Sequence, residues 1–345
     1  MARRARVLLL TEDEHDHRQV HHLVEAGILP LRAPWVLAPT DLGSLPLTPD
    51  LVVAVGRSGT LPAARLRERL GLPGARPRDV LTLLDRGLLR RRAREVGVPI
   101  PRPLSAIGAR NWHFRSPLAA RTGDEVRRVA EPADLPLDGE VSYEEWIDAE
   151  VCHVDGVAVG GRVVTAVASR YLGTRHDFAA GAGMGGVTIE DTEAAPLLAA
   201  AELTVSRLSI PDGAFHVELF DAPGGPILLG AAPHPPDPVL RAMVRAATGV
   251  DLVAEHIRAG VGQPTYPRRT RAAVAGYWRI PPRPPRQPGS RPTLPDLHSD
   301  VVLATLPQPA GHGPTEVVIA GTNPARVLTD LLSLRERLDE QVGAA

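Results

Sequence analysis

A single carboxylate on an otherwise apolar strand is the first candidate for chemistry in this chain. Over residues 212–238, alternating apolar and polar residues, a Gly- and Pro-rich turn and a second apolar run predict a β-hairpin. Glu218 lies on the first strand, and a carboxylate oxygen is a ligand that Mg2+ accepts. On the second strand Gly230 and Ala232 have no ligating atoms, so the hairpin predicts one oxygen donor without a partner.

Three other patterns are weaker candidates for a binding site. Asp13, His17 and His21 recur at intervals of four on a predicted helix, where a solvated face is favoured over a metal site. Residues 178–187 contain Gly-x-Gly-x-x-Gly, but a strand-like segment follows instead of a helix, so we predict a mobile loop rather than a dinucleotide-binding turn. The single Cys152 excludes an internal disulfide framework and a cysteine metal cluster, and we expect it to be a buried strand residue.

The composition contains no lysine, and all 39 basic residues other than histidine are arginines. A coding bias toward arginine is one explanation for the absence of lysine. Whatever its origin, a mechanism that places two lysines on phosphates cannot operate here in its usual form. The net charge of −1 supplies no bulk field that would attract nucleic acid or an anionic membrane. No apolar run approaches a membrane span, and residues 1–10 are too short for a signal peptide, so we expect a cytoplasmic location.

The order of predicted elements indicates an α/β chain of two or three compact units. A strand at 6–10 precedes a helix that a capping box from Thr11 to Glu14 is expected to open, and a strand at 51–55 precedes a helix at 61–72. A meander of strands is predicted over 141–173. The remaining predictions are a helix at 192–208, a helical pair at 240–264 broken at Gly249, a strand at 316–320, and a helix at 323–342 with Leu328, Leu331, Leu332 and Leu338 on one face.

The hairpin resembles the metal-binding hairpin of the ATP-grasp ligases, in the branch that joins a carboxylate to an amine. His216, Glu218 and Phe220 match the His-x-Glu-x-Phe pattern of its first strand. On the second strand, Gly230 stands at the position of a Glu. The other matching positions are Ala232 for an Asn or a small residue, His234 for a basic residue, Asp85 and Arg86 for an Asp-Lys pair, and Gly97, Val98, Pro99 and Pro101 for Gly-Val-Pro-x-Pro.

This resemblance implies an ATP site with ATP and Mg2+ as cofactors. Glu145, Trp146 and Ile147 correspond to the linker that meets the adenine, and Glu150 corresponds to the glutamate that binds the ribose. Glu218 corresponds to a magnesium ligand. The cations implied at the phosphates or at an anionic substrate are Arg86, Arg121 and Arg170.

The segment that should form the lid over the phosphates departs furthest from the family pattern. Ala120 or Arg121 stands where the family has a second lysine, and Gly123 is what remains of its glycines. Asp124 and Glu125 put negative charge where phosphates would lie, whereas a Gly-rich loop would offer backbone amides.

The resemblance also implies the fold and its division into domains. We expect an α/β (α+β) ATP-grasp fold with a small N-terminal α/β domain at 1–80 and an ATP-grasp core at 81–262 with a shortened lid at 104–140. A C-terminal lobe is expected at 263–345. Its Pro- and Arg-rich loop at 281–292 favours a linker, with a peptide ligand for a partner as the alternative.

Three functional hypotheses remain open on the sequence. The favoured one is an ATP-grasp protein that has lost or weakened phosphoryl transfer and acts as a scaffold, with an active ligase or another pathway protein as partner. The second is an active ATP-dependent carboxylate–amine ligase, acting on small carboxylates and amines, in which arginines replace the lysines. The third is a nucleotide or metabolite sensor without turnover. No nucleic-acid or membrane partner is expected, and a homodimer is compatible with the sequence.

Overall fold

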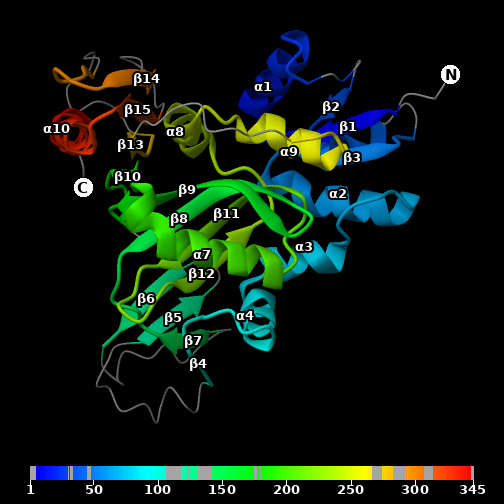
Figure 1. Ribbon diagram of the computed structural model, residues 1–345, viewed down its shortest axis with the longest axis horizontal. Coiled ribbons are helices and arrows are strands. Elements are labelled where there is room, and N and C mark those ends of the chain that lie inside the picture. The colour runs from blue at the N-terminus through cyan, green and yellow to red at the C-terminus, as the bar shows by residue number, and fades with distance from the viewer. Residues whose placement is uncertain are drawn as a thin grey trace.

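Three sheets organise the protein, as a computed structural model shows. The structure describes residues 5–29, 31, 34–44, 48–105, 118–122, 125–130, 141–174, 177–178, 180–265, 274–282, 292–306 and 314–342. Within these residues the sheets have three, eight and four strands. Figure 1 shows the three-stranded sheet near the N-terminus, the eight-stranded sheet in the middle, and the four-stranded sheet at the lower end. The predicted α/β class is confirmed.

The N-terminal unit is a parallel sheet in the order β2-β1-β3. Its strands are β1 (Val7–Leu10), β2 (Trp35–Leu37) and β3 (Leu51–Ala54), with helices α1 (Glu14–Glu25) and α2 (Arg57–Leu70) and a 3-10 turn at Pro39–Ser44. The predicted capping box is wrong, because Asp13 and not Thr11 is the N-cap of α1 and accepts from the Asp16 amide. Glu12 instead accepts from the Arg57 amide at the start of α2, at 2.9 Å, where a carboxylate complements the helix dipole.

The eight-stranded sheet has the order β12-β11-β8-β9-β10-β13-β15-β14, and its neighbouring strands are antiparallel. The predicted hairpin is confirmed as two of these strands. The strands are β8 (Val151–Val159), β9 (Arg162–Leu172), β10 (Met184–Thr188), β11 (Gly213–Phe220), β12 (Ile227–Ala232), β13 (Val274–Ile280), β14 (Asp300–Thr305) and β15 (Thr315–Gly321). The last three strands therefore continue the sheet that contains the hairpin.

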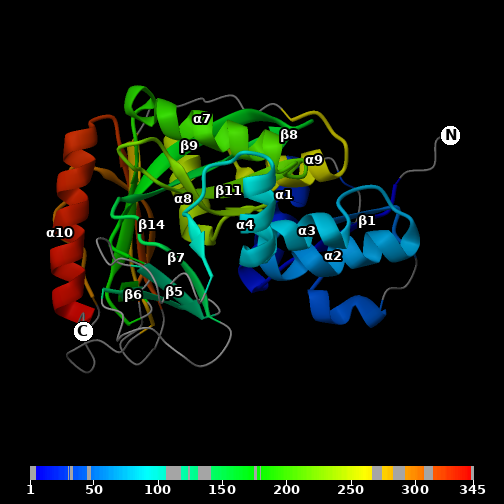
Figure 2. The ribbon, with the colours of Figure 1, turned by 90° about the horizontal axis from the view of Figure 1, so that it is seen from below.

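Helices cover both faces of this sheet, and alternation along each strand decides which residues face which helices. Cys152 and Val154 pack in a core with α7 (Asp191–Arg207). Val157 packs on the opposite face, in a core that it shares with residues of α8 (Pro238–Thr248) and α9 (Leu252–Gly260). Figure 2 shows α7 along one face of β8 and β9, and α10 (Pro324–Val342) at the far edge of the molecule. The helical pair broken at Gly249 is confirmed.

The N-terminal unit is joined to the large sheet through α9 and α8. Helix α9 supplies Val253 and Ile257 to the core around β1 and β3. His256 on the same helix accepts a hydrogen bond from the Ala214 amide at Nδ1 (2.9 Å), and its Nε2 lies 2.8 Å from the Ala54 carbonyl. A buried ion pair of 2.6 Å between Arg241 of α8 and Asp16 of α1 adds a second link.

The four-stranded sheet has the order β4-β7-β5-β6 and occupies the place of the predicted lid. Its strands are β4 (Pro103–Leu104), β5 (Leu118–Thr122), β6 (Glu125–Val129) and β7 (Ser142–Glu145). It follows the short helices α3 (Pro77–Leu84) and α4 (Arg86–Glu95) along the chain. Gly123 and Asp124, and most of the Pro- and Arg-rich loop, lie outside the described residues.

Two predictions of local structure are corrected. Residues 184–188 form strand β10 and not a mobile loop, since the sheet needs glycine there: a Cβ at Gly185 would lie 2.5 Å from the Trp278 ring. On α10 the buried apolar residues are Val327, Leu331, Leu334 and Leu338. Leu328 and Leu332 are 40% and 51% exposed, so the predicted face is displaced around the helix.

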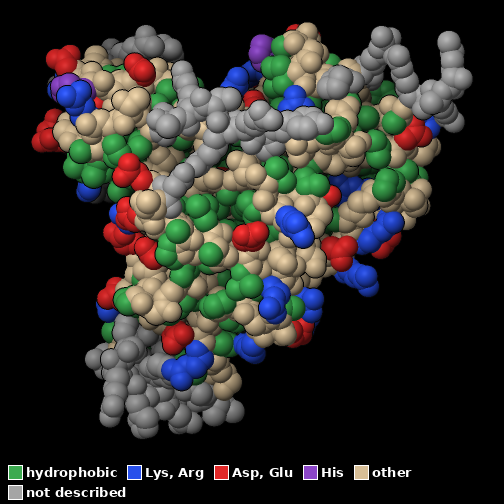
Figure 3. All heavy atoms as spheres, viewed as in Figure 1, with side chains coloured by type: hydrophobic (Ala, Val, Ile, Leu, Met, Phe, Trp, Pro, Cys, Tyr) green, Lys and Arg blue, Asp and Glu red, His purple; other side chains and the backbone are tan. Residues whose placement is uncertain are grey.

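The charged side chains are mixed on the face of the molecule that Figure 3 shows. Figure 3 shows acidic and basic side chains interspersed over one face, as the net charge of −1 leads one to expect. In the described residues, every helix is too short or too polar to cross a membrane.

Candidate functional site

Glu218 occupies the place in β11 that its alternation predicts, with Gly230 as its direct cross-strand partner in β12. A Cβ built on Gly230 would lie 3.3 Å from Glu218 Oε2, so a side chain there would reach the same carboxylate. His216 pairs in the same way with Ala232. The register confirms that neither residue of the second strand that faces this pair carries a ligating side chain.

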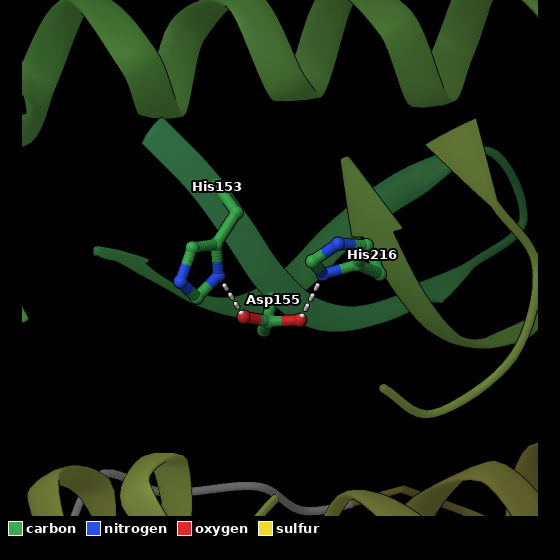
Figure 4. A group of neighbouring side chains, drawn as sticks. All are labelled: His153, Asp155 and His216. Carbon is green, nitrogen blue, oxygen red and sulfur yellow. Dashed lines mark hydrogen bonds and ion pairs between the residues drawn. The ribbon is translucent and has the colours of Figure 1, made fainter. Parts of the chain in front are cut away.

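Four polar side chains, those of His153, Asp155, His216 and Glu218, form a compact group. Strand β8 lies on the other side of β11, and its His153 and Asp155 are the cross-strand partners of Glu218 and His216 respectively. His153 Nδ1 lies 2.6 Å from Asp155 Oδ2, and His216 Nδ1 lies 2.8 Å from Asp155 Oδ1. His216 Nε2 is 3.6 Å from Glu218 Oε1. Figure 4 shows the two imidazoles turned toward Asp155 from opposite sides.

Burial makes the electrostatics of this group strong, because His153 and Asp155 are fully buried and Glu218 is 7% exposed. Burial alone would raise the pKa of Asp155, but the charge of His216 and the hydrogen bonds of both imidazoles lower it below its usual range. Burial alone would lower the pKa of His216, but Asp155 and Glu218 raise it to about 10. His216 is therefore a cation at neutral pH, held between two carboxylates.

Two further side chains complete the surroundings of this group. The Tyr171 hydroxyl donates to Glu218 Oε1 at 3.2 Å, and the Tyr171 ring packs against the His153 ring with centroids 4.5 Å apart. Ser169 is the cross-strand neighbour of His153 in β9. Ser169 Oγ and His153 Nε2 are both buried and have no hydrogen-bond partner in the part of the chain that the structure describes.

The linker predicted to meet an adenine follows β7. Glu144 at its start is buried and forms a 3.0 Å ion pair with Arg90 of α4, which also donates to the Leu228 carbonyl. The Glu145 side chain accepts from the Arg102 amide, and the Trp146 ring stacks under the Arg128 guanidinium. Trp146 and Ile147 lie outside any strand, and among the described residues their peptide groups form no backbone hydrogen bond. These peptide groups are therefore free of strand pairing, as an adenine-binding linker requires.

The three arginines proposed from the sequence lie in different surroundings. Arg86 is the first residue of α4, after the N-cap Asp85, and its Nη1 is buried without a hydrogen-bond partner in the described residues. Arg121 lies on β5, and its side chain is outside the described set. Arg170 of β9 forms ion pairs of 2.8 Å with Glu150 and 2.7 Å with Glu193. Glu150 and Arg170, proposed for the ribose and for an anion, thus contact each other.

Sequence reasoning missed His153, Asp155 and Tyr171 as members of the site. The available signal was the i, i+2 spacing of His153 and Asp155, which puts both on one face of a strand. His216 and Glu218 have the same spacing on β11. Nothing local shows that β8 and β11 are neighbours, since His216 and Asp155 are 61 positions apart in the chain.

The family resemblance implies ATP and Mg2+, and the residues present fit the adenine of ATP better than they fit the magnesium ions. A two-ion magnesium clamp needs several oxygen ligands. Glu218 faces glycine in β12, and His216, two residues away on β11, is already positively charged. The site therefore does not fit that clamp. The adenine side fits better, because among the described residues the linker peptides form no backbone hydrogen bond.

No protein-family model matches the chain, and no curated protein matches it in sequence. Solved structures match it over nearly its whole length. An L-amino acid ligase from Bacillus licheniformis is 15% identical, with a TM-score of 0.72 over 99% of this chain and 98% of that one. N5-carboxyaminoimidazole ribonucleotide synthetase from Thermotoga maritima is 14% identical, with a TM-score of 0.68 over 97% and 98%. N5-carboxyaminoimidazole synthase from Aspergillus clavatus, solved with ADP and 5-aminoimidazole ribonucleotide, is 13% identical, with a TM-score of 0.68 over 97% and 99%. The chain has the ATP-grasp fold.

Proposed function

We propose that this chain, with its ATP-grasp fold, is a binding protein that has lost phosphoryl transfer and serves as a partner of another protein, such as an active ligase. The observation that carries this proposal is the register of the hairpin. Glu218 faces Gly230 across the strand pair, so the hairpin itself supplies one carboxylate to a magnesium clamp.

The electrostatics of the site support the same conclusion. Phosphoryl transfer depends on positioning and on cations that neutralise charge at the transferred phosphoryl group. Here the imidazolium of His216 lies 3.6 Å from the Glu218 carboxylate, which lowers the attraction of that carboxylate for Mg2+. Arg170 is held in two ion pairs, so that cation is also compensated within the protein. Both observations favour ligand binding over phosphoryl transfer.

Nucleotide binding without turnover is a second candidate function. Arg86 favours it, because its buried Nη1 has no hydrogen-bond partner among the described residues and could donate to an anion. The linker at Trp146 and Ile147 offers free peptide groups for an adenine edge. The structure of the Aspergillus clavatus synthase holds ADP, and the same class of ligand is proposed for this chain.

Thermal and chemical unfolding with nucleotide test both candidates. ATP at one hundred times its dissociation constant should raise the free energy of unfolding by about 2.7 kcal/mol. We expect the increase to be the same with Mg2+ and with EDTA, because the hairpin supplies one carboxylate, Glu218, to a magnesium clamp. Arg86→Ala should remove most of the increase. Arg91→Ala, an exposed arginine of the same helix, is the matched control and should retain it.

The outcomes separate the two candidates. An increase that appears with Mg2+ and disappears with EDTA contradicts the loss of the magnesium site. Absence of any increase at millimolar ATP removes nucleotide binding and leaves the protein-partner function.

A further inference from the structure

The group of two imidazoles and two carboxylates around Asp155 has no role in the proposed binding of a partner or a nucleotide. We propose that His153, Asp155 and His216 bind one first-row transition-metal ion of the Zn2+ type between strands β8 and β11 of the large sheet. This inference is independent of the proposed function, because it requires neither nucleotide nor partner.

The positions of the donor atoms carry the proposal. One ligand atom from each of His153, Asp155 and His216 lies within 4.8 Å of the other two. Zinc bonds of about 2.0–2.1 Å place tetrahedral ligands roughly 3.3 Å apart. The two imidazole nitrogens lie 2.6 Å and 2.8 Å from Asp155 oxygens, so donor atoms of all three residues already adjoin one another.

The type of donor selects the class of metal. Two imidazoles and one carboxylate suit zinc, iron, cobalt or nickel, whereas Mg2+ prefers a set of oxygens. The proposed site is distinct from the incomplete magnesium site of the hairpin, where Glu218 faces Gly230 of β12. The donors of the proposed site come from β8 and from His216 of β11. Three protein ligands leave a position open for water or for a group of a bound molecule.

A bound divalent ion would keep the charge of Asp155 compensated. Asp155 is fully buried, and in the described part of the chain the two imidazoles are its hydrogen-bond partners, with no guanidinium among them. A buried carboxylate requires a compensating charge. In the metal-free protein the His216 imidazolium supplies this charge, and a divalent ion bound between the imidazoles and Asp155 would displace the imidazole protons and supply it instead.

The surrounding structure holds the three ligands on rigid elements. His153 and Asp155 lie two residues apart on β8, and His216 lies directly across from Asp155 on β11. The Tyr171 ring packs on the His153 ring and restricts its rotation. Ligands that project from paired central strands are placed more precisely than ligands on loops.

Metal analysis of the full-length protein tests this site. After purification without chelator and dialysis against Zn2+, we expect about one ion per chain by mass spectrometry. The metal-free protein should bind Co2+ and develop the visible absorption of a cobalt site with imidazole ligands, and its melting temperature should rise. His153→Gln and His216→Gln should each abolish the cobalt spectrum.

The exposed pair His17 and His21 supplies the matched control, because their Nε2 atoms lie 3.1 Å apart on α1 and could retain metal at the surface. The double variant His17→Gln, His21→Gln should keep both the ion and the cobalt spectrum. X-ray absorption of this control loaded with Zn2+ should show two imidazole ligands, which tests the site even if the His153 variant does not fold.

Three results would overturn the site. The first is metal below about 0.1 ion per chain without a cobalt spectrum, which would leave a hydrogen-bonded network only. The second is loss of the ion in the His17, His21 control. The third is an all-oxygen ligand shell in that control. None of these results depends on whether ATP binds, so they leave the proposed function unaffected.

Discussion

Replacing Asp155 by alanine is expected to lower the free energy of unfolding by about 3–5 kcal/mol. Asp155 is fully buried and accepts hydrogen bonds from two buried or largely buried imidazoles. Its removal leaves the Nδ1 groups of His153 and His216 without their acceptor and takes away the charge that stabilises the His216 imidazolium. Urea unfolding in the presence of EDTA measures the change in the metal-free protein.

Two companion variants define what is lost. Asp155→Asn keeps the size and one acceptor but removes the charge, so it should lie between the alanine variant and the unmodified protein. Asp300→Ala on the exposed strand β14 is the control and should change stability by less than about 0.5 kcal/mol. Equal stability of Asp155→Ala and Asp300→Ala would contradict the role given to the buried carboxylate.

The second large effect is a loss of stability between pH 6.5 and pH 4. His256 joins the N-terminal unit to the large sheet, and both of its ring nitrogens contact backbone groups. The Ala214 amide can only donate and the Ala54 carbonyl can only accept, so Nδ1 is the acceptor and Nε2 carries the proton of a neutral ring. Burial, together with the charges of His234 and Arg67, lowers the pKa of His256 from 6.5 to about 4.

The sign of the effect follows from this lowered pKa. Between pH 6.5 and pH 4 the unfolded chain binds a proton that the folded protein does not bind, so the stabilising contribution of His256 is complete above pH 6.5 and falls on acidification. A difference of this size corresponds to about 3 kcal/mol. Burial lowers the pKa of His234 to about 4 as well, so it titrates in the same range.

Urea unfolding at pH 7.5, 6, 5 and 4.5 measures this dependence. His256→Gln should reduce the slope without abolishing it, because His234 remains. Acidification opposes this effect at His216, whose pKa is raised to about 10, so the test is the comparison of the two proteins. A pH dependence as steep in His256→Gln as in the unmodified protein would show that His256 is not held neutral.

Much of the fold follows from local patterns, while the site depends on pairings that such patterns do not specify. The alternation at Glu218 and the Gly- and Pro-rich turn were sufficient to predict the hairpin and the absence of a ligand at Gly230. The N-cap of α1 was misplaced because Thr11 and Asp13 are both good caps, and the tertiary contact of Glu12 with α2 decides between them. Strand β14 was missed altogether.

The composition of the site was harder to predict for the same reason. Asp155 gains its importance only when β8 pairs with β11, which brings together residues 61 positions apart. Arg170 looked available for an anion until the fold placed Glu150 and Glu193 beside it. The sequence shows which residues are charged, but the partner that compensates each charge lies on another strand or helix.

The release of ADP from ATP tests the central claim most directly, which is that the fold persists without its magnesium clamp. The full-length protein, incubated with ATP, Mg2+ and a panel of small carboxylates and amines, is expected to release no ADP above the protein-free background. Release of ADP that requires Mg2+ and disappears in Glu218→Ala would contradict the claim and establish a working ligase.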